Sequence, residues 1–193
     1  MWRDGPVEGL SISGTVRYWQ GMRSIPGVDV KLALAADPKA VIAVTKAGVE
    51  GRFLFEGLDF DDYVLTANTP VKSGSAVDSG DYLALLKLMA GRNPIPDPDG
   101  PGPLRAASPS NYQQIAADLD QNSIVNTVDL RAIFAQSTSS REMQSVSLVT
   151  NEFDQPMKVV TPASENVSDI TLVFVLLGDL DGSWNPWGTD FRG

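Results

Sequence analysis

Residues 118–129 read Asp-Leu-Asp-Gln-Asn-Ser-Ile-Val-Asn-Thr-Val-Asp, with oxygen-bearing side chains at positions 1, 3, 5, 9 and 12 of the stretch. In a tightly wound loop alternate side chains point to one centre, position 7 offers its backbone carbonyl, and a carboxylate at position 12 enters from the following helix. This is the EF-hand spacing, and it predicts a Ca²⁺ site followed by a helix. The predicted ligands are the side chains of Asp118, Asp120, Asn122, Asn126 and Asp129 and the carbonyl of Ile124.

Two positions of this loop depart from the usual pattern. Position 6 is Ser123, where glycine would tolerate a left-handed backbone at a cost about 1 kcal/mol lower. Position 12 is Asp129 in place of the usual glutamate. An Asp-rich turn in which Asp129 caps the helix beginning near Leu130, with no ion bound, is the alternative. Five oxygen side chains at the correct positions favour the metal site.

The back half of the same pattern occurs earlier in the chain. A shift of 48 residues lays 76–83 on 124–131, and each copy is the end of a loop and the start of a helix. Counting back from Asp81 places Pro, Lys and Gly at positions 1, 3 and 5. The first copy therefore keeps only the Ala76 carbonyl, Asp78 and Asp81 as ligands.

The front half of the pattern stands near the other end of the chain, in Gly-Asp-Leu-Asp-Gly-Ser-Trp at 178–184. It offers the side-chain oxygens of Asp179, Asp181 and Ser183. We expect the two halves to meet around a second Ca²⁺, which would require long-range docking of the tail. A surface turn, or completion of the loop within the tail by Asp190, remains the alternative.

Loop-helix repeats with Asp at position 12 and no regular helix before the loop resemble dockerins, modules that attach bacterial extracellular proteins to cohesin domains. The resemblance implies a cohesin-like protein partner. It also implies that loop positions 10 and 11 and the outer helix faces meet this partner. Those positions are Thr127, Val128, Phe134 and Ala135 in the second copy, and Ser79, Gly80, Leu86 and Lys87 in the first.

The first third of the chain carries short alternating apolar segments at 12–18, 28–32, 40–44, 52–55 and 63–66, separated by Gly and Pro turns. Such spacing predicts antiparallel strands in a small sandwich. The runs 14–18, 25–30, 51–58 and 62–65 resemble prealbumin-like sandwiches of bacterial surface proteins, of the carboxypeptidase-regulatory or Cna-B type. Some relatives carry an internal isopeptide bond, for which Lys31 and Asn68 lie in suitable strands; an ordinary surface lysine is the alternative.

We therefore predict an α+β chain with three parts. An N-terminal antiparallel β-sandwich spans 1–69, and a dockerin-like pair of loop-helix repeats spans 70–140, with helices expected at 81–90, 111–117 and 128–137. Strands are expected at 145–149, 157–160 and 170–177, within a segment 141–193 whose Asp-rich tail packs back on the repeats. The apolar run 170–177 has almost no polar face and must be buried.

Composition limits the classes of function. Of 24 acidic residues 18 are Asp, only 15 residues are basic, and the net charge is −9. Binding to nucleic acid is excluded because the basic residues form no stripe. Cysteine and histidine are absent, which removes thiol and histidine catalysis and Cys/His zinc sites. No stretch is apolar enough to span a membrane. The N-terminus lacks a signal-peptide core, which indicates either a cytosolic protein or a piece of a larger one. We expect the second, a monomeric piece of an extracellular protein.

The sequence thus favours a non-catalytic, calcium-binding attachment module. A calcium-stabilised stalk or adhesin end-piece without a cohesin partner is the first alternative. A carbohydrate-binding module is the second, with Trp2, Trp19, Trp184 and Trp187 as stacking platforms, although tryptophans more often cover a small core. Catalysis by the cluster Asp59, Asp61 and Asp62 has the weakest support, because no paired acid is positioned near it.

Overall fold

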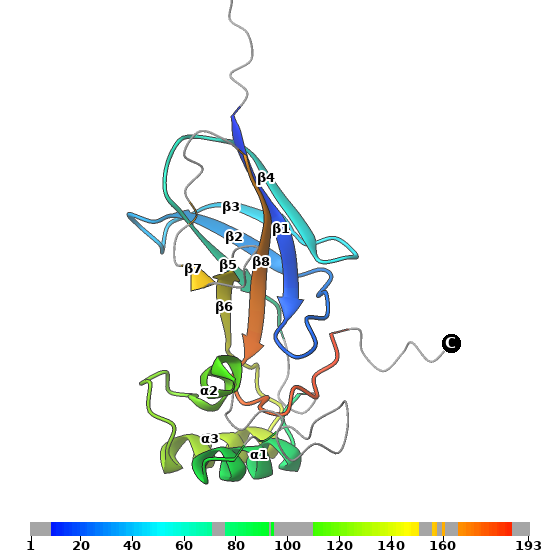
Figure 1. The fold of residues 1–193 in the computed structure, drawn as a ribbon, viewed down its shortest axis with the longest axis vertical. Coiled ribbons are helices and arrows are strands. Elements are labelled where there is room, and N and C mark those ends of the chain that lie inside the picture. Colours follow the sequence, from blue (N-terminus) through cyan, green and yellow to red (C-terminus); the bar gives the residue numbers. More distant parts are fainter. Residues whose placement is uncertain are drawn as a thin grey trace, which may run out of the picture. The chain divides into compact units, whose positions relative to one another are not determined.

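The computed structural model describes residues 9–70, 76–92, 94, 110–150, 156–157, 160 and 166–186. Five strands come first, then three helices, then three strands (Figure 1). None of the described helices has the length and apolar character needed to cross a membrane. The elements are β1 (Leu10–Tyr18), β2 (Asp29–Leu34), β3 (Val41–Lys46), β4 (Arg52–Leu58), β5 (Tyr63–Asn68), α1 (Ser79–Met89), α2 (Asn111–Ala117), α3 (Thr127–Ser137), β6 (Ser145–Thr150), β7 (Pro156–Met157) and β8 (Val167–Leu176).

The chain divides into two compact units. Met1–Thr69 and Ser147–Phe174 form the sandwich unit, and Pro70–Val146 and Val175–Gly193 form the helical unit. The α+β class predicted from the sequence is confirmed, and the division after residue 69 coincides with the predicted end of the sandwich. The segment 141–193 is divided between the units: residues 147–174 belong to the sandwich unit, and residues 141–146 and 175–193 belong to the helical unit.

Two sheets build the sandwich unit. The five-stranded sheet has the order β4-β1-β8-β6-β7, and the three-stranded sheet has the order β3-β2-β5. Strand β1 pairs antiparallel with β4 and parallel with β8. The parallel pair brings a strand of the C-terminal segment, whose pairing the sequence did not predict, into the sheet of the N-terminal strands. Ile170 and residues 172–176 of β8 are nearly inaccessible, as a central strand requires.

Alternation along β1 explains why it can occupy the middle of a sheet. Every second residue from Leu10 to Tyr18 is buried, and the residues between are half-exposed. The isopeptide hypothesis gains no support from the register, in which Lys31 faces Thr66 and Asn68 faces Asp29. Asn68 is exposed.

Each helix of the helical unit begins with a capping box, in which the cap side chain and the third helical side chain bond each other's backbone amides. The cap residues are Asp78 for α1, Ser110 for α2 and Asn126 for α3. Helices α1 and α3 pack against each other, with the rings of Tyr82 and Phe134 edge to face at 6.0 Å. Both helices start a residue or two earlier than predicted, because the cap brings the residues after it into the first turn.

Candidate metal centres

The loop before α3 gathers three carboxylates. One oxygen each from Asp118, Asp120 and Asp129 lies within 4.8 Å of the others. Ser123 at loop position 6 has φ of 67°, the left-handed backbone that the pattern requires there. The loop therefore winds as the spacing predicts, at the strain cost of a non-glycine residue in this conformation.

Backbone amides fix the first carboxylate of this loop. Asp118 accepts hydrogen bonds from the amides of Asn122 at 3.0 Å and Ser123 at 2.7 Å. Asn122 in turn accepts from the amide of Ile124 at 2.8 Å. The side-chain amide of Asn126 donates a hydrogen bond to the Ile124 carbonyl at 3.0 Å. All six predicted ligands of the contiguous loop thus lie in one short turn of chain.

Asp129 closes the loop from the helix side. It is fully buried, one oxygen accepts from the Asn126 amide at 2.9 Å, and the other accepts from the Leu119 amide at 2.9 Å. One carboxylate therefore joins the beginning of the loop to the beginning of α3. The N-cap itself is Asn126, so Asp129 serves as the third residue of the capping box and not as the cap considered above.

The two half-loops that are far apart in sequence meet in the helical unit. One oxygen each from Asp78, Asp81 and Asp181 lies within 4.8 Å of the others. Asp81 is fully buried and accepts from the Asp78 amide at 2.9 Å through one oxygen. Its other oxygen accepts from the amides of Leu180 at 2.7 Å and Asp181 at 3.2 Å. Ala76, whose carbonyl was assigned as a ligand, is buried two residues before the cap.

The tail repeats the hydrogen bonding of the contiguous loop. Asp179 is fully buried and accepts from the amides of Ser183 at 3.0 Å and Trp184 at 3.0 Å, as Asp118 accepts from the residues four and five places on. Asp181 accepts from the Ser183 amide at 2.9 Å, as Asp120 accepts from Asn122 at 3.2 Å. The tail therefore repeats the hydrogen bonds that Asp118 and Asp120 accept from the backbone of the contiguous loop.

Glycine at position 80 is explained by this docking. A β-carbon there would lie 2.9 Å from an oxygen of Asp181 and 2.9 Å from an oxygen of Asp78. The equivalent residue of α3 is Val128, which is exposed and meets no tail. The first copy thus carries the smaller residue where a second segment approaches.

Negative charge is concentrated at both centres. Within the described residues, no ion pair reaches the carboxylates of Asp78, Asp81, Asp118, Asp120, Asp129 or Asp181. The pKa of Asp81 is raised to about 7, first by burial and also by the charges of Asp179 and Asp181, against the lowering effect of the Asp78 amide. A bound cation would remove this repulsion. Donor sets made of oxygen alone suit hard cations such as Ca²⁺ or Mg²⁺, and the loop geometry fits Ca²⁺.

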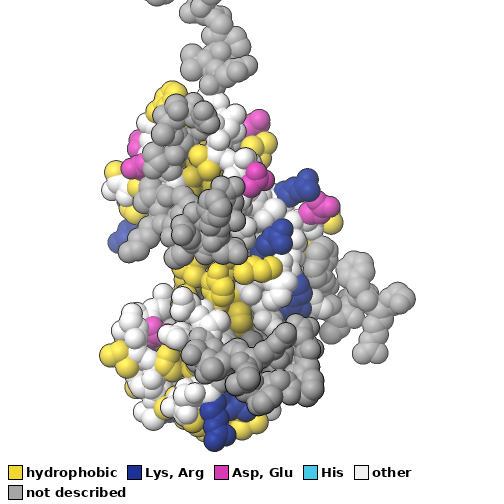
Figure 2. All heavy atoms as spheres, in the orientation of Figure 1, with side chains coloured by type: hydrophobic (Ala, Val, Ile, Leu, Met, Phe, Trp, Pro, Cys, Tyr) yellow, Lys and Arg dark blue, Asp and Glu magenta, His cyan; other side chains and the backbone are white. Residues whose placement is uncertain are grey.

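The residues assigned to partner contact lie at the surface. Leu86, Val128 and Phe134 have exposed fractions of 40%, 56% and 59%. Leu83 and Met89 on α1, which were not among the predicted contact residues, are also exposed, by 56% and 42%. The sequence carries no signal that singles them out, because α1 is apolar on nearly every face. Figure 2 shows hydrophobic side chains at the surface of the helical unit. Ser79, Lys87, Thr127 and Ala135 are also exposed, and Gly80 is half-exposed.

The other candidate sites fare differently. Trp19 and Trp184 are buried, so neither ring offers a stacking platform. Asp59, Asp61 and Asp62 are exposed, in and beside the turn between β4 and β5. Trp2, Trp187 and Asp190 lie outside the described residues.

Comparisons with known proteins add little to this geometry. No family model matches the chain, and no curated protein matches it. Among solved structures, it is similar to the group B streptococcus pilus 2b backbone protein, with 18% identity and a TM-score of 0.28. The match covers 36% of this chain and 32% of that one, so the chain spans about a third of the matched structure. A likeness of this size carries no conclusion about function.

Proposed function

We propose that this chain is a non-catalytic, calcium-dependent attachment module of an extracellular bacterial protein. Two Ca²⁺ ions organise the helical unit, one in the loop 118–129 and one between the segments 76–81 and 179–183. The exposed faces of α1 and α3 bind a cohesin-like protein domain.

One observation carries the calcium assignment. Two acidic loops of different connectivity share the same hydrogen bonds: a buried aspartate on the third residue of a helix accepts the amide of the second loop residue, 2.9 Å for Asp129 and 2.7 Å for Asp81. Ionised carboxylates this close repel each other, and a cation bound in both places would relieve that repulsion.

The position-12 aspartate supports an extracellular setting. Aspartate is one methylene shorter than the usual bidentate glutamate, so Asp129 and Asp81 reach the ion less completely and the affinity is lower. Weak sites are filled where free calcium is abundant, as for extracellular modules with Kd values of about 10⁻⁴–10⁻³ M.

The apolar helix faces support a protein partner. Leu83, Leu86 and Met89 on α1 and Val128 and Phe134 on α3 expose large side chains on the same pair of packed helices. Aromatic and aliphatic groups of this kind form the centres of protein interfaces. The two faces differ in composition, so the partner has one preferred orientation on the module.

Capture of the full chain on immobilised cohesin domains, with calcium and with chelator, tests the proposal. We expect calcium-dependent binding that Phe134→Ser weakens about tenfold or more, since hot-spot aromatics contribute 2 kcal/mol or more. Phe60→Ser is the matched control, because Phe60 is 71% exposed in the sandwich unit. The number of calcium ions bound by the Phe134→Ser variant shows whether both loops still fold without the contact between Phe134 and Tyr82.

Two results would contradict the attachment role. If Phe134→Ser and Phe60→Ser reduced cohesin binding equally, the contact would lie elsewhere. If the chain had both calcium ions bound and no cohesin captured it, the structural stalk would be favoured.

A further inference from the structure

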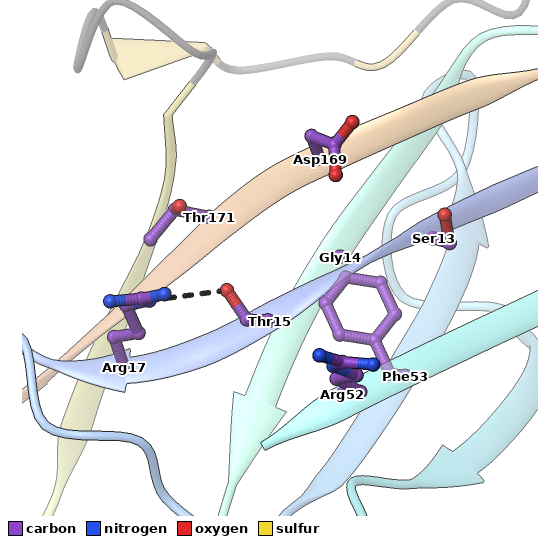
Figure 3. A pocket seen from close by; sticks show the side chains of 8 residues that line it. All are labelled: Ser13, Gly14, Thr15, Arg17, Arg52, Phe53, Asp169 and Thr171. Atoms are coloured by element: carbon purple, nitrogen blue, oxygen red, sulfur yellow. Dashed lines mark hydrogen bonds between the residues drawn. The ribbon is translucent and has the colours of Figure 1, made fainter. Parts of the chain in front are cut away.

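A polar groove lies on the sandwich unit, on the face of β4, β1 and β8 turned away from the core (Figure 3). Its volume is about 530 Å³, and it is open to solvent along one side. Its polar side chains are Ser13, Thr15, Arg17, Arg52, Asp169 and Thr171, and Gly14 and Phe53 complete the lining. The proposed attachment function uses none of them.

Strand register explains why these side chains share one face. Thr15 of β1 pairs with Arg52 of β4 on one side and with Thr171 of β8 on the other. Residues directly opposite in neighbouring strands project to the same side of a sheet, and every second residue along a strand does so as well. Ser13 and Arg17 therefore extend this row in both directions along β1.

A bulge in β8 adds the carboxylate. Between the pairs formed by Ile12 and Gly14, β1 advances two residues while β8 advances three, from Val167 to Ile170. Asp169 sits in this bulge with φ of 61°. Bulges redirect side chains. A non-glycine residue in the left-handed region is strained, and strained backbone conformations of this kind cluster at functional sites.

Gly14 allows β1 and β8 to approach closely beside this bulge. A β-carbon at Gly14 would lie 2.2 Å from the Ile170 carbonyl oxygen. Any larger residue would push β1 and β8 apart and would alter the place from which Asp169 projects. The local sequence thus maintains one arrangement of the polar groups.

The charge of the groove is opposite to that of the chain. Two arginines face one aspartate here, although the whole chain has a net charge of −9. Arg17 is held in position by Thr15 Oγ1 at 3.3 Å and by the Met22 carbonyl at 3.4 Å, through Nε and Nη1. Within the described residues its Nη2 makes no hydrogen bond, so donors remain for a ligand. Arg52 contacts Glu50 at 2.9 Å but is 76% exposed, a weak pair that a ligand can displace.

We propose that this groove binds an acidic saccharide. The guanidinium groups of Arg17 and Arg52 hold the anionic group of the sugar, since guanidinium binds carboxylate or sulfate through paired hydrogen bonds. Ser13, Thr15, Thr171 and Asp169 hold the ring hydroxyls, because hydroxyls and a carboxylate together supply donors and acceptors for a polyol. A volume of about 530 Å³ accommodates about one or two sugar rings.

Titration of the full chain with digalacturonate, followed by calorimetry, tests this assignment. Arg17→Gln and Arg52→Gln are each expected to weaken binding about tenfold, the loss of one charge-assisted contact. Arg92→Gln makes the same charge change in the helical unit and should leave the affinity unchanged. Asp169→Asn keeps a residue that tolerates positive φ, so it tests the carboxylate without removing the bulge.

Neutral and inorganic probes separate the parts of the proposal. We expect maltose and inorganic phosphate to compete weakly, because each supplies only half of the recognised chemistry. Sulfated disaccharide in place of digalacturonate shows which anionic group is preferred. The assignment is overturned if digalacturonate does not bind, if Arg92→Gln weakens it as much as Arg17→Gln, or if maltose or phosphate alone competes equally well. Calcium stoichiometry is independent of all these outcomes, so failure here leaves the attachment proposal standing.

Discussion

The contiguous loop and the split loop differ in how the chain supplies the same atoms. In the first, Asp129 accepts an amide 10 residues away; in the second, Asp81 accepts an amide 99 residues away. Both buried carboxylates bridge a helix start to a loop start. The comparison shows that the pattern depends on where side chains and amides lie, and that chain continuity through the loop is dispensable.

The difference in separation has an energetic consequence. Closing a loop about ten times longer costs roughly 2 kcal/mol more entropy in a flexible chain. Burial of Ile170 and of residues 172–177 offsets this cost, because β8 ends at Leu176 and the chain then leads into Asp179. We therefore expect the split site to be the weaker of the two and the more sensitive to change.

Removal of the tail should have the largest effect. A chain that ends at Leu177 lacks the front half of the split loop, so it should bind one Ca²⁺ where the full chain binds two. The start of α1 should also lose protection in hydrogen exchange, since Asp81 no longer accepts the Leu180 amide. Retention of two bound ions after truncation would show that the tail contributes no ligands.

Paired substitutions of the bridging aspartates should have the next largest effect. Asp129→Asn and Asp81→Asn each replace a buried carboxylate, which accepts two backbone amides at Asp129 and three at Asp81, at a cost of about 1–3 kcal/mol of stability. Each variant should lose only its own ion, as measured by calorimetric titration with calcium. If either variant lost both ions, the two sites would bind calcium as one cooperative unit. The two loops could then not be compared as independent sites.

Acidity should affect the split site next. The folded pKa of Asp81 is raised to about 7, above its unfolded value, so the ion-free folded chain holds a proton that the unfolded chain releases. Stability of the ion-free chain should therefore fall as pH rises from about 4 to 7. Calcium requires the ionised form, so its affinity for the split site should weaken below pH 7.

Titration of the Asp129→Asn variant, which keeps only the split site, measures this pH effect. Proton release on calcium binding at pH 6 should be present in that variant and should disappear in the Asp81→Asn variant. Release of equal size in both variants would assign the proton to another group.

Gly80→Ala should have the smallest effect. The new β-carbon would lie 2.9 Å from the Asp181 oxygen, so the tail must shift slightly and calcium affinity of the split site should fall a few-fold. Ion-free α1 should gain a few tenths of a kcal/mol from the better helix former. Val128→Ala at the equivalent position of α3 should change neither quantity. Unchanged affinity in the Gly80 variant would mean that the tail does not approach this closely when calcium is bound.

Local sequence predicted the elements that depend on near neighbours. The three helices, the strands and the left-handed Ser123 follow from caps, turns and alternation within a few residues. Complementary half-loops also led the sequence analysis to pair Asp81 with the tail, because the missing positions of one fragment were those present in the other.

Features that depend on distant packing could not be obtained in this way. Nothing in residues 167–176 states that β8 pairs with β1, or in parallel, since a uniformly apolar strand fits any central position. Exposure of Leu83 and Met89 could not be separated from burial, because α1 has no polar face by which to orient it. The groove around Arg17 arises from a register shift between strands far apart in sequence, which no local pattern encodes.

Calcium stoichiometry of the full, ion-free chain tests the central claim most directly. Calorimetric titration should give two bound Ca²⁺ per chain, the stronger belonging to the loop 118–129 and the weaker to the split loop. A single bound ion that survives in Asp81→Asn would contradict the split site. Absence of any bound calcium would contradict both centres and the attachment function that depends on them.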